Sequence, residues 1–93
     1  MPAASSVPKY RVVFTSSAER ELKKLPPQVI ARILSRIETL SSNPRPAGCK
    51  KLQGGDREWR IRVGDYRVVY AIDDPKLLVE VTRVRHRKDV YQW

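Results

Sequence analysis

The sequence predicts an α+β fold, made of a strand, a helical hairpin and a three-stranded antiparallel meander, with both helices on one face of the sheet. Apolar residues recur with helical spacing over positions 16–40, whereas β-branched and aromatic residues alternate with polar ones over 58–84. A proline pair divides the helical part in two. We expect residues 1–8 to be a flexible leader, because they are small and polar and contain proline, and residues 9–93 to form one domain that ends in a short tail or helix.

The first strand is predicted over residues 9–15, whose apolar side chains alternate onto one face: Tyr10, Val12 and Phe14. Ser16 and Glu19 have the spacing of a capping box, so a helix should begin at Ser16. Pro26 ends this helix, and Pro27 can serve as the first residue of the next one.

The second helix is predicted over residues 27–40, and its apolar residues form a stripe that we interpret as core packing: Val29, Ile30, Ile33, Leu34, Ile37 and Leu40. Residues 43–57 then form the longest irregular segment. Because loops on a rigid scaffold often carry binding groups, we consider its basic residues Lys50, Lys51 and Arg57 as contacts for a nucleic-acid backbone. A plain solvated connection is the alternative.

The centre of the meander is a hairpin whose two-residue turn, Gly64-Asp65, suits type II′ geometry. Val63 then faces Tyr66 across the strands, and every other pair follows. One face should be the core face, with the side chains Trp59, Ile61, Val63, Tyr66, Val68 and Tyr70. The uncovered face carries Arg60, Arg62 and Arg67.

This arginine face is unfavourable for stability, because like charges directly across a strand pair repel by roughly 0.2–1 kcal/mol. Guanidinium groups on one rigid patch suit a bound phosphate, since their donors match phosphate oxygens. An exposed face that is simply solvated is the alternative. The last strand is predicted over residues 77–84, and its broken alternation leaves the faces of Glu80 and Arg83 open.

The charge of the whole chain points to a polyanionic partner. Nineteen Lys and Arg against ten Asp and Glu give a net charge of +9, which favours nucleic acid first and an acidic protein second. With Cys49 as the single cysteine and His86 as the single histidine, we expect no structural metal site and no cofactor. No apolar run reaches the length of a membrane span and no secretory signal is evident, so we expect no membrane partner and a cytoplasmic protein.

Cleavage of a phosphodiester needs a base, an acid, and positive charge at the transition state. RNA supplies its own nucleophile, the 2′-OH, so a protein can act without a metal. Positive charge is offered by Arg60, Arg62, Arg67, Arg85 and Arg87. The candidates for proton transfer are His86, whose unperturbed pKa lies near neutrality, and Tyr91.

Two stretches, Glu58–Tyr70 and Val84–Tyr91, resemble the RelE toxins of bacterial and archaeal toxin–antitoxin systems, and the order of strands and helices agrees with a RelE-like fold. The resemblance implies a ribosome-dependent endoribonuclease that cuts mRNA in the ribosomal A site through 2′-OH attack. It also implies inhibition of translation and silencing by a cognate, RelB-like antitoxin protein.

By position, the resemblance assigns Arg60 and Arg62 to two basic positions before the turn, and Arg67 to the arginine after it. Arg87 matches a basic residue after the last strand, and Tyr91 matches an aromatic residue that stacks on a base or takes part in proton transfer. The candidate RNA-binding residues around them are Lys50, Lys51, Arg57, Arg85 and Lys88.

The chain departs from the family pattern in two ways. Arginine stands at 60 and 62 where lysine is frequent, and arginine is a poorer general base because its pKa exceeds ~12. The spacing from Arg87 to Tyr91 is also shorter than in the best-known members. His86 and Tyr91 therefore stay open as alternatives for the base.

Two other functions compete with the nuclease. The first is a ParE-like toxin, which shares the fold, inhibits DNA gyrase and cuts nothing. The second is a basic RNA-binding module without catalysis. The combined basic and aromatic residues favour the nuclease over both.

Overall fold

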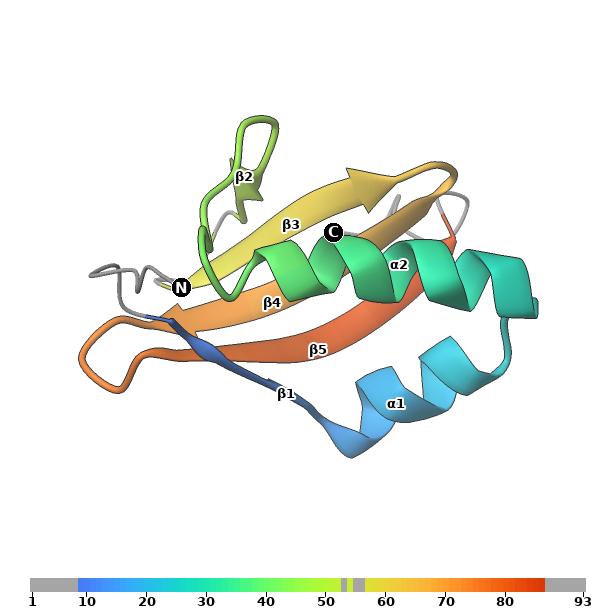
Figure 1. Cartoon of the computed structure of the whole chain (residues 1–93), viewed down its shortest axis with the longest axis horizontal. Helices are drawn as coiled ribbons and strands as arrows, with labels where there is room; N and C mark the ends of the chain where they lie inside the picture. The colour runs from blue at the N-terminus through green and yellow to red at the C-terminus, as the bar shows by residue number, and fades with distance from the viewer. Residues whose placement is uncertain (1–8, 53, 55–56, 87–93) are drawn as a thin grey trace, which may run out of the picture.

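The computed structural model describes residues 9–52, 54 and 57–86, which form a five-stranded sheet with two helices on one side (Figure 1). The predicted α+β class is confirmed. No helix of the described part is long and apolar enough to cross a membrane. The elements in chain order are β1 (Arg11–Phe14), α1 (Ser16–Lys23), α2 (Pro27–Thr39), β2 (Lys50–Lys51), β3 (Glu58–Val63), β4 (Tyr66–Asp73) and β5 (Leu78–His86).

The strand order across the sheet is β1-β5-β4-β3-β2. The meander of β3, β4 and β5 is antiparallel as predicted, and β1 joins its edge parallel to β5. The short strand β2 lies inside the segment that was predicted to be irregular. Its two lysines pair with Arg60 and Trp59 of β3, and two residues are too few to produce an alternating pattern in the sequence.

The predicted hairpin register is confirmed, with Val63 opposite Tyr66 and Trp59 opposite Tyr70. Gly64 has a φ of +61°, whereas Asp65 is not in the left-handed region, as a type II′ turn requires. The turn residues therefore fix which hairpin side chains face the helices.

The first helix begins at Ser16 as predicted, but the predicted capping box is wrong. Thr15 is the N-cap, because its Oγ1 accepts the Ala18 N–H at 3.1 Å. The same hydroxyl donates to the Thr82 carbonyl of β5 at 3.3 Å. This contact between elements far apart in the sequence places the cap one residue earlier than the local pattern indicates.

The core lies between the helices and one face of the sheet. Of the predicted core face of the hairpin, the side chains of Ile61, Val63, Val68 and Tyr70 are buried, and Trp59 and Tyr66 pack against them partly buried. From the predicted stripe of α2, the residues Ile33, Ile37 and Leu40 are buried, and Val29 and Ile30 pack at the margin. Leu34 is wrong as a core residue: it is 41% exposed, because only one side of α2 meets the sheet.

A β-bulge at Thr82 interrupts β5. The pairing with β4 passes from Val69–Arg83 to Tyr70–Val81, so Thr82 is an extra residue. The phase of the buried side chains changes there, and the buried valines of β5 are Val79, Val81 and Val84. The bulge explains the broken alternation of the sequence. Glu80 and Arg83, whose faces the sequence alone did not determine, are both exposed on the face away from the helices.

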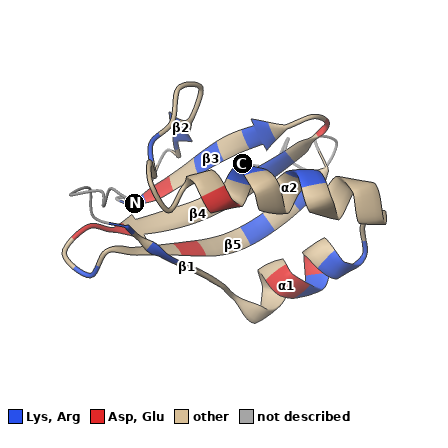
Figure 2. Cartoon of the chain, viewed as in Figure 1, with Lys and Arg blue, Asp and Glu red and all other residues tan. Residues whose placement is uncertain are grey.

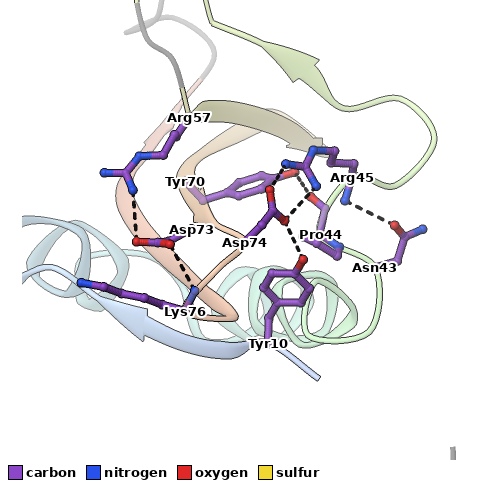
Figure 3. Close-up of polar contacts among 9 residues, drawn as sticks. All are labelled: Tyr10, Asn43, Pro44, Arg45, Arg57, Tyr70, Asp73, Asp74 and Lys76. Atoms are coloured by element: carbon purple, nitrogen blue, oxygen red, sulfur yellow. Dashed lines mark hydrogen bonds and ion pairs between the residues drawn. The ribbon is translucent and has the colours of Figure 1, made fainter. Parts of the chain in front are cut away.

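Charged residues are distributed unevenly over the fold. Figure 2 shows Lys and Arg along β3, β4 and β5 toward the β3–β4 turn, and several Asp and Glu toward the β4–β5 turn. The acidic end is held by ion pairs (Figure 3): Asp74 bonds Arg45 at 2.8 Å, and Asp73 bonds Arg57 at 3.1 Å. The hydrogen bond and charge of Arg45, with the hydrogen bond from Tyr10, lower the pKa of the Asp74 carboxyl.

The same cluster fixes the segment that leads into β2. Arg45 lies over the Trp59 ring, with its Cζ atom 5.4 Å from the ring centroid. The fully buried Tyr70 donates its hydroxyl to the buried Pro44 carbonyl at 2.8 Å (Figure 3). Segment 43–49 is thus held to β3 and β4, which positions Lys50 beside Arg60.

We expect Tyr70→Phe to lower the free energy of unfolding by about 1–2 kcal/mol, because the buried Pro44 carbonyl loses its donor. Burial also raises the pKa of the Tyr70 phenol. Stability from the protonated phenol is fully present below the unfolded-state pKa of ~10 and is lost as the pH rises above it. Denaturant unfolding at pH 7 and above pH ~10 should therefore show a smaller alkaline loss for the variant. Equal stability of both proteins at pH 7 would contradict this account.

Candidate nucleic-acid interface

The face of the sheet opposite the helices is not covered by any helix or strand of the described residues, and we call it the open face. Side chains of four strands stand on it in rows. Across the strands, Arg62 of β3 faces Arg67 of β4, and Arg67 faces Arg85 of β5. The next row runs Lys50, Arg60, Val69 and Arg83. We call these two rows the cationic rows. They are two residues apart along each strand, or roughly 6–7 Å.

A third row ends the positive surface. Glu58 faces Ala71, which faces Glu80, so two carboxylates follow the cationic rows in the direction of the β4–β5 turn. Phosphate groups are attracted to the first two rows and repelled by the third. The open face therefore has one half suited to a polyanion, and that half lies next to the β3–β4 turn.

The bulge in β5 makes the cationic rows continuous. If β5 alternated regularly through Thr82, Arg83 and Arg85 would face the helices and Val84 would face solvent. The bulge takes up Thr82, so that Val84 is buried at 3% exposure and both arginines share the open face with Arg67. The bulge thus keeps two of the six cations of the rows on the open face.

The open face is hollowed in two adjoining places. The smaller hollow, of about 200 Å³, is lined by Gly48, Lys50, Arg60, Ile61, Arg62 and Arg67. The larger one, of about 610 Å³, is lined by Lys50, Lys51, Leu52, Glu58, Arg60, Val69, Thr82 and Arg83. Lys50 and Arg60 border both. The small hollow has the room and the positive charge to hold a phosphate, and the large one has room for a nucleoside.

Two guanidinium groups of the first row are anchored through Nε. Arg62 donates Nε–H to the carbonyl of Gly64 at 3.0 Å. Arg85 donates Nε–H to Oε2 of Glu21, on α1, at 2.7 Å. Anchoring through Nε leaves the terminal amino groups for a ligand, and it reduces the freedom that binding would otherwise have to remove.

The structure brings together Lys50, Arg60, Arg62, Arg67 and Arg85 from the predicted site. Two other described candidates are not in the cationic rows. Arg57 lies just before β3 in its ion pair with Asp73. Lys51 is opposite Trp59, but it lines the larger hollow together with Lys50 and Arg60.

His86 also lies apart from the arginines. It is opposite Tyr66 on the helix-covered face, and the two rings meet edge to face with centroids 5.1 Å apart. The remaining predicted residues, Arg87, Lys88 and Tyr91, lie outside the described residues. Within residues 9–52, 54 and 57–86, no group of three His, Cys, Asp or Glu side chains could hold a metal ion.

The sequence reasoning missed the roles of two residues, Arg83 and Glu21. The sequence did not determine which face of the sheet Arg83 lies on, because the bulge is not visible in it. Glu21 carries a signal that could have been used: it follows Ala18 by three residues and precedes Leu25 by four, so a charge stands on the apolar stripe of α1. A carboxylate at such a position needs a partner.

A model of the family described as ParE toxin of type II toxin-antitoxin system, parDE, matches residues 12–91. Toxin RelG of Mycobacterium tuberculosis is 37% identical over 84 residues, which cover 89% of this chain and 97% of that protein. The chain belongs to the RelE family of type II toxins. The putative toxin RelE1 of Methanocaldococcus jannaschii is 30% identical over 87 residues, covering 90% of this chain and 97% of that protein.

Solved structures of RelE relatives share the fold. The toxin of the RelBE2 toxin–antitoxin complex from M. tuberculosis aligns with a TM-score of 0.75 and 36% identity, covering 91% of this chain and 98% of the other. The archaeal RelE–RelB complex from Pyrococcus horikoshii aligns with a TM-score of 0.77 and 26% identity, covering 88% of this chain and 99% of the other. The resemblance to RelE toxins and the RelE-like fold predicted from the sequence are confirmed.

We expect Arg67→Ala to weaken binding of a short single-stranded RNA and to reduce the slope of log K against log salt by about 0.7, the value of one phosphate contact. Arg57→Ala removes the same charge outside the cationic rows, so its slope should stay near that of the wild type. Fluorescence anisotropy over a series of salt concentrations measures both. Equal loss in the two variants would show that net charge, and not the rows, binds the RNA.

Proposed function

We propose that this type II toxin is a ribosome-dependent endoribonuclease that cleaves mRNA in the ribosomal A site and so inhibits translation. The observation that carries the proposal is the pair of cationic rows over two adjoining hollows on the open face. The names of its RelE relatives support the same activity in general. In the reaction the 2′-OH would lose its proton, and its oxygen would bond to the neighbouring phosphorus as the bond from phosphorus to the 5′-oxygen breaks. The 5′-oxygen would take up a proton, so the products are a 2′,3′-cyclic phosphate and a 5′-hydroxyl.

The arginines would act by charge. Arg67 stands in the middle of its row, between two other arginines, where it can meet a phosphate that gains negative charge in the transition state. Arg60 and Arg62 line the small hollow with it and would hold the non-bridging oxygens. We assign Arg87 the same charge-stabilising role on the family pattern.

The proton would be taken by Tyr91 or His86. An arginine is unsuited, because its neutral form is scarcely populated at pH 7. His86 lies on the face opposite the cationic rows, which favours Tyr91. A cluster of guanidinium groups also lowers the pKa of a nearby phenol, since it stabilises the phenolate.

The ribosome would supply what the open face lacks. The described part of that face offers charge and a hollow surface but no histidine. Substrate orientation therefore has to contribute much of the rate, by holding the 2′-OH in line with the scissile bond. An mRNA fixed in the A site meets this need, and a free RNA chain does not.

A RelB-like antitoxin is the partner that we propose for silencing. Several of the solved relatives are RelE–RelB toxin–antitoxin complexes. The cationic rows suit acidic contacts from such a protein, and β1 and β2, at the edges of the sheet, offer strands to which it could add another. Antitoxin contacts that cover the cationic rows would also prevent RNA from binding there.

A ParE-like toxin that inhibits DNA gyrase is the second candidate, because the matching family model carries the ParE name. The two functions differ in their first effect in a cell. An endoribonuclease stops translation, whereas a gyrase inhibitor first induces DNA-damage signalling. The cationic rows favour the former.

We expect the protein to cut a defined mRNA only when that mRNA is bound to ribosomes with an empty A site. Primer extension with and without ribosomes maps the cleavage. Arg67→Ala should slow single-turnover cleavage by about 10²–10³-fold, the effect of removing one donor that stabilises the transition state. Efficient cleavage of free RNA at the same protein concentration would contradict the ribosome requirement, and wild-type rates in Arg67→Ala would contradict the role of Arg67.

We expect Tyr91→Phe to lose the ascending limb of the pH–rate profile and His86→Gln to keep it, because His86 faces away from the cationic rows. Single-turnover cleavage on programmed ribosomes over a range of pH measures both. A profile that changes in His86→Gln and not in Tyr91→Phe would reverse the assignment. Full rates and unchanged profiles in both variants would show that neither residue is the base.

A further inference from the structure

Glu21 is a carboxylate on the apolar side of α1, and both of its oxygens are bonded to the end of β5. Oε1 accepts the backbone N–H of Val84 at 2.8 Å, and Oε2 accepts Nε–H of Arg85 at 2.7 Å. The side chain is 21% exposed. Two charge-assisted bonds from one partly buried carboxylate fix both the backbone and a side chain of the strand.

The shape of the sheet explains why β5 needs this carboxylate. β1 pairs with β5 only as far as Phe14 opposite Val81, and the chain then turns into α1. Beyond that point no strand of the described residues lies along the outer edge of β5, so none of these strands can supply an acceptor for the Val84 N–H. Glu21 takes the place of the missing strand, just after the bulge.

The second bond acts on the cationic rows. Arg85 ends the first row and faces Arg67 directly, so two like charges oppose each other across the strands. Glu21 offsets this repulsion from the outer side. Because the bond uses Nε, both terminal amino groups of Arg85 are without a partner among residues 9–52, 54 and 57–86.

We propose that Glu21 is a positioning residue, which holds the Arg85 guanidinium at the end of the first row with its terminal amino groups available to an RNA phosphate. The proposal rests on the proposed function in so far as RNA is the ligand. It extends the site to α1, an element without a residue in the cationic rows. It also assigns a functional role to a negative charge beside a surface that binds negative charge.

The direction in which RNA affinity changes distinguishes a positioning role of Glu21 from a purely electrostatic one. Removal of a carboxylate near an RNA site should tighten RNA binding if charge alone matters. If Glu21 orients Arg85, Glu21→Gln should weaken binding instead, by about tenfold, which lies within the coupling usual for residues in direct contact. Glu19→Gln is the matched control, because it removes the same charge from an exposed position of the same helix.

The test is a double-mutant cycle of Glu21→Gln and Arg85→Ala, read by anisotropy of a short single-stranded RNA with 2′-O-methyl groups, which cannot be cleaved. We expect Glu21→Gln to weaken binding in the wild-type background and to change nothing in the Arg85→Ala background. The same loss in both backgrounds, or tighter binding equal to that of Glu19→Gln, would overturn the proposal.

A second variant covers the case in which Glu21→Gln does not fold. Arg85→Lys keeps the charge but has one amino group, which Glu21 would hold, so it should bind RNA as weakly as Arg85→Ala. Wild-type affinity of Arg85→Lys would overturn the proposal.

A third readout does not depend on RNA. The Nε–H resonance of Arg85 should be protected from exchange in the wild type and in Glu19→Gln, and exposed in Glu21→Gln. If the protein bound no RNA, the proposed function would fail, while this resonance would still decide whether Glu21 holds Arg85. A resonance unprotected in the wild type would overturn the proposal.

Discussion

The helices cover one face of the sheet and leave the other open, and most of the molecule follows from that constraint. Side chains of a strand alternate between faces, so each strand divides its residues between a buried and a solvated set. The buried set forms the core with α1 and α2. The other set does not pack against the helices, and there the sequence places like charges side by side at a cost in stability. The proposed binding of RNA to this face would explain the arrangement.

The sequence could predict what local chemistry determines. The turn Gly64-Asp65 fixed the register of the hairpin, so its apolar face and its arginine face could be assigned residue by residue. The proline pair placed the boundary between the helices, and α2 begins at Pro27 as predicted. In each case a backbone restriction acts on neighbouring residues, and the restriction is visible in the residue type.

What the sequence could not predict depends on contacts between distant segments. The bulge at Thr82 exists because β5 must bury Val84 and expose both flanking arginines, which no local rule specifies. The cap at Thr15 depends on its second contact, with β5. His86 was grouped with the arginines because it is next to them in the sequence, but one step along a strand reverses the face. Proximity in the chain was therefore misleading in the one place where it supported a catalytic role.

The distribution of charge over the open face limits how an RNA chain can lie on it. Glu58 and Glu80 end the positive surface toward the β4–β5 turn. There Arg45 and Arg57 are already neutralised by ion pairs. A phosphate backbone that followed the strands would pass from the cationic rows onto carboxylates, whereas one that crosses the strands stays among cations. The described part of β5 reaches His86, at the cationic end of the sheet. An RNA that crosses the strands there is held beside the point from which residues 87–91 continue, and it is from those residues that we draw the proposed base.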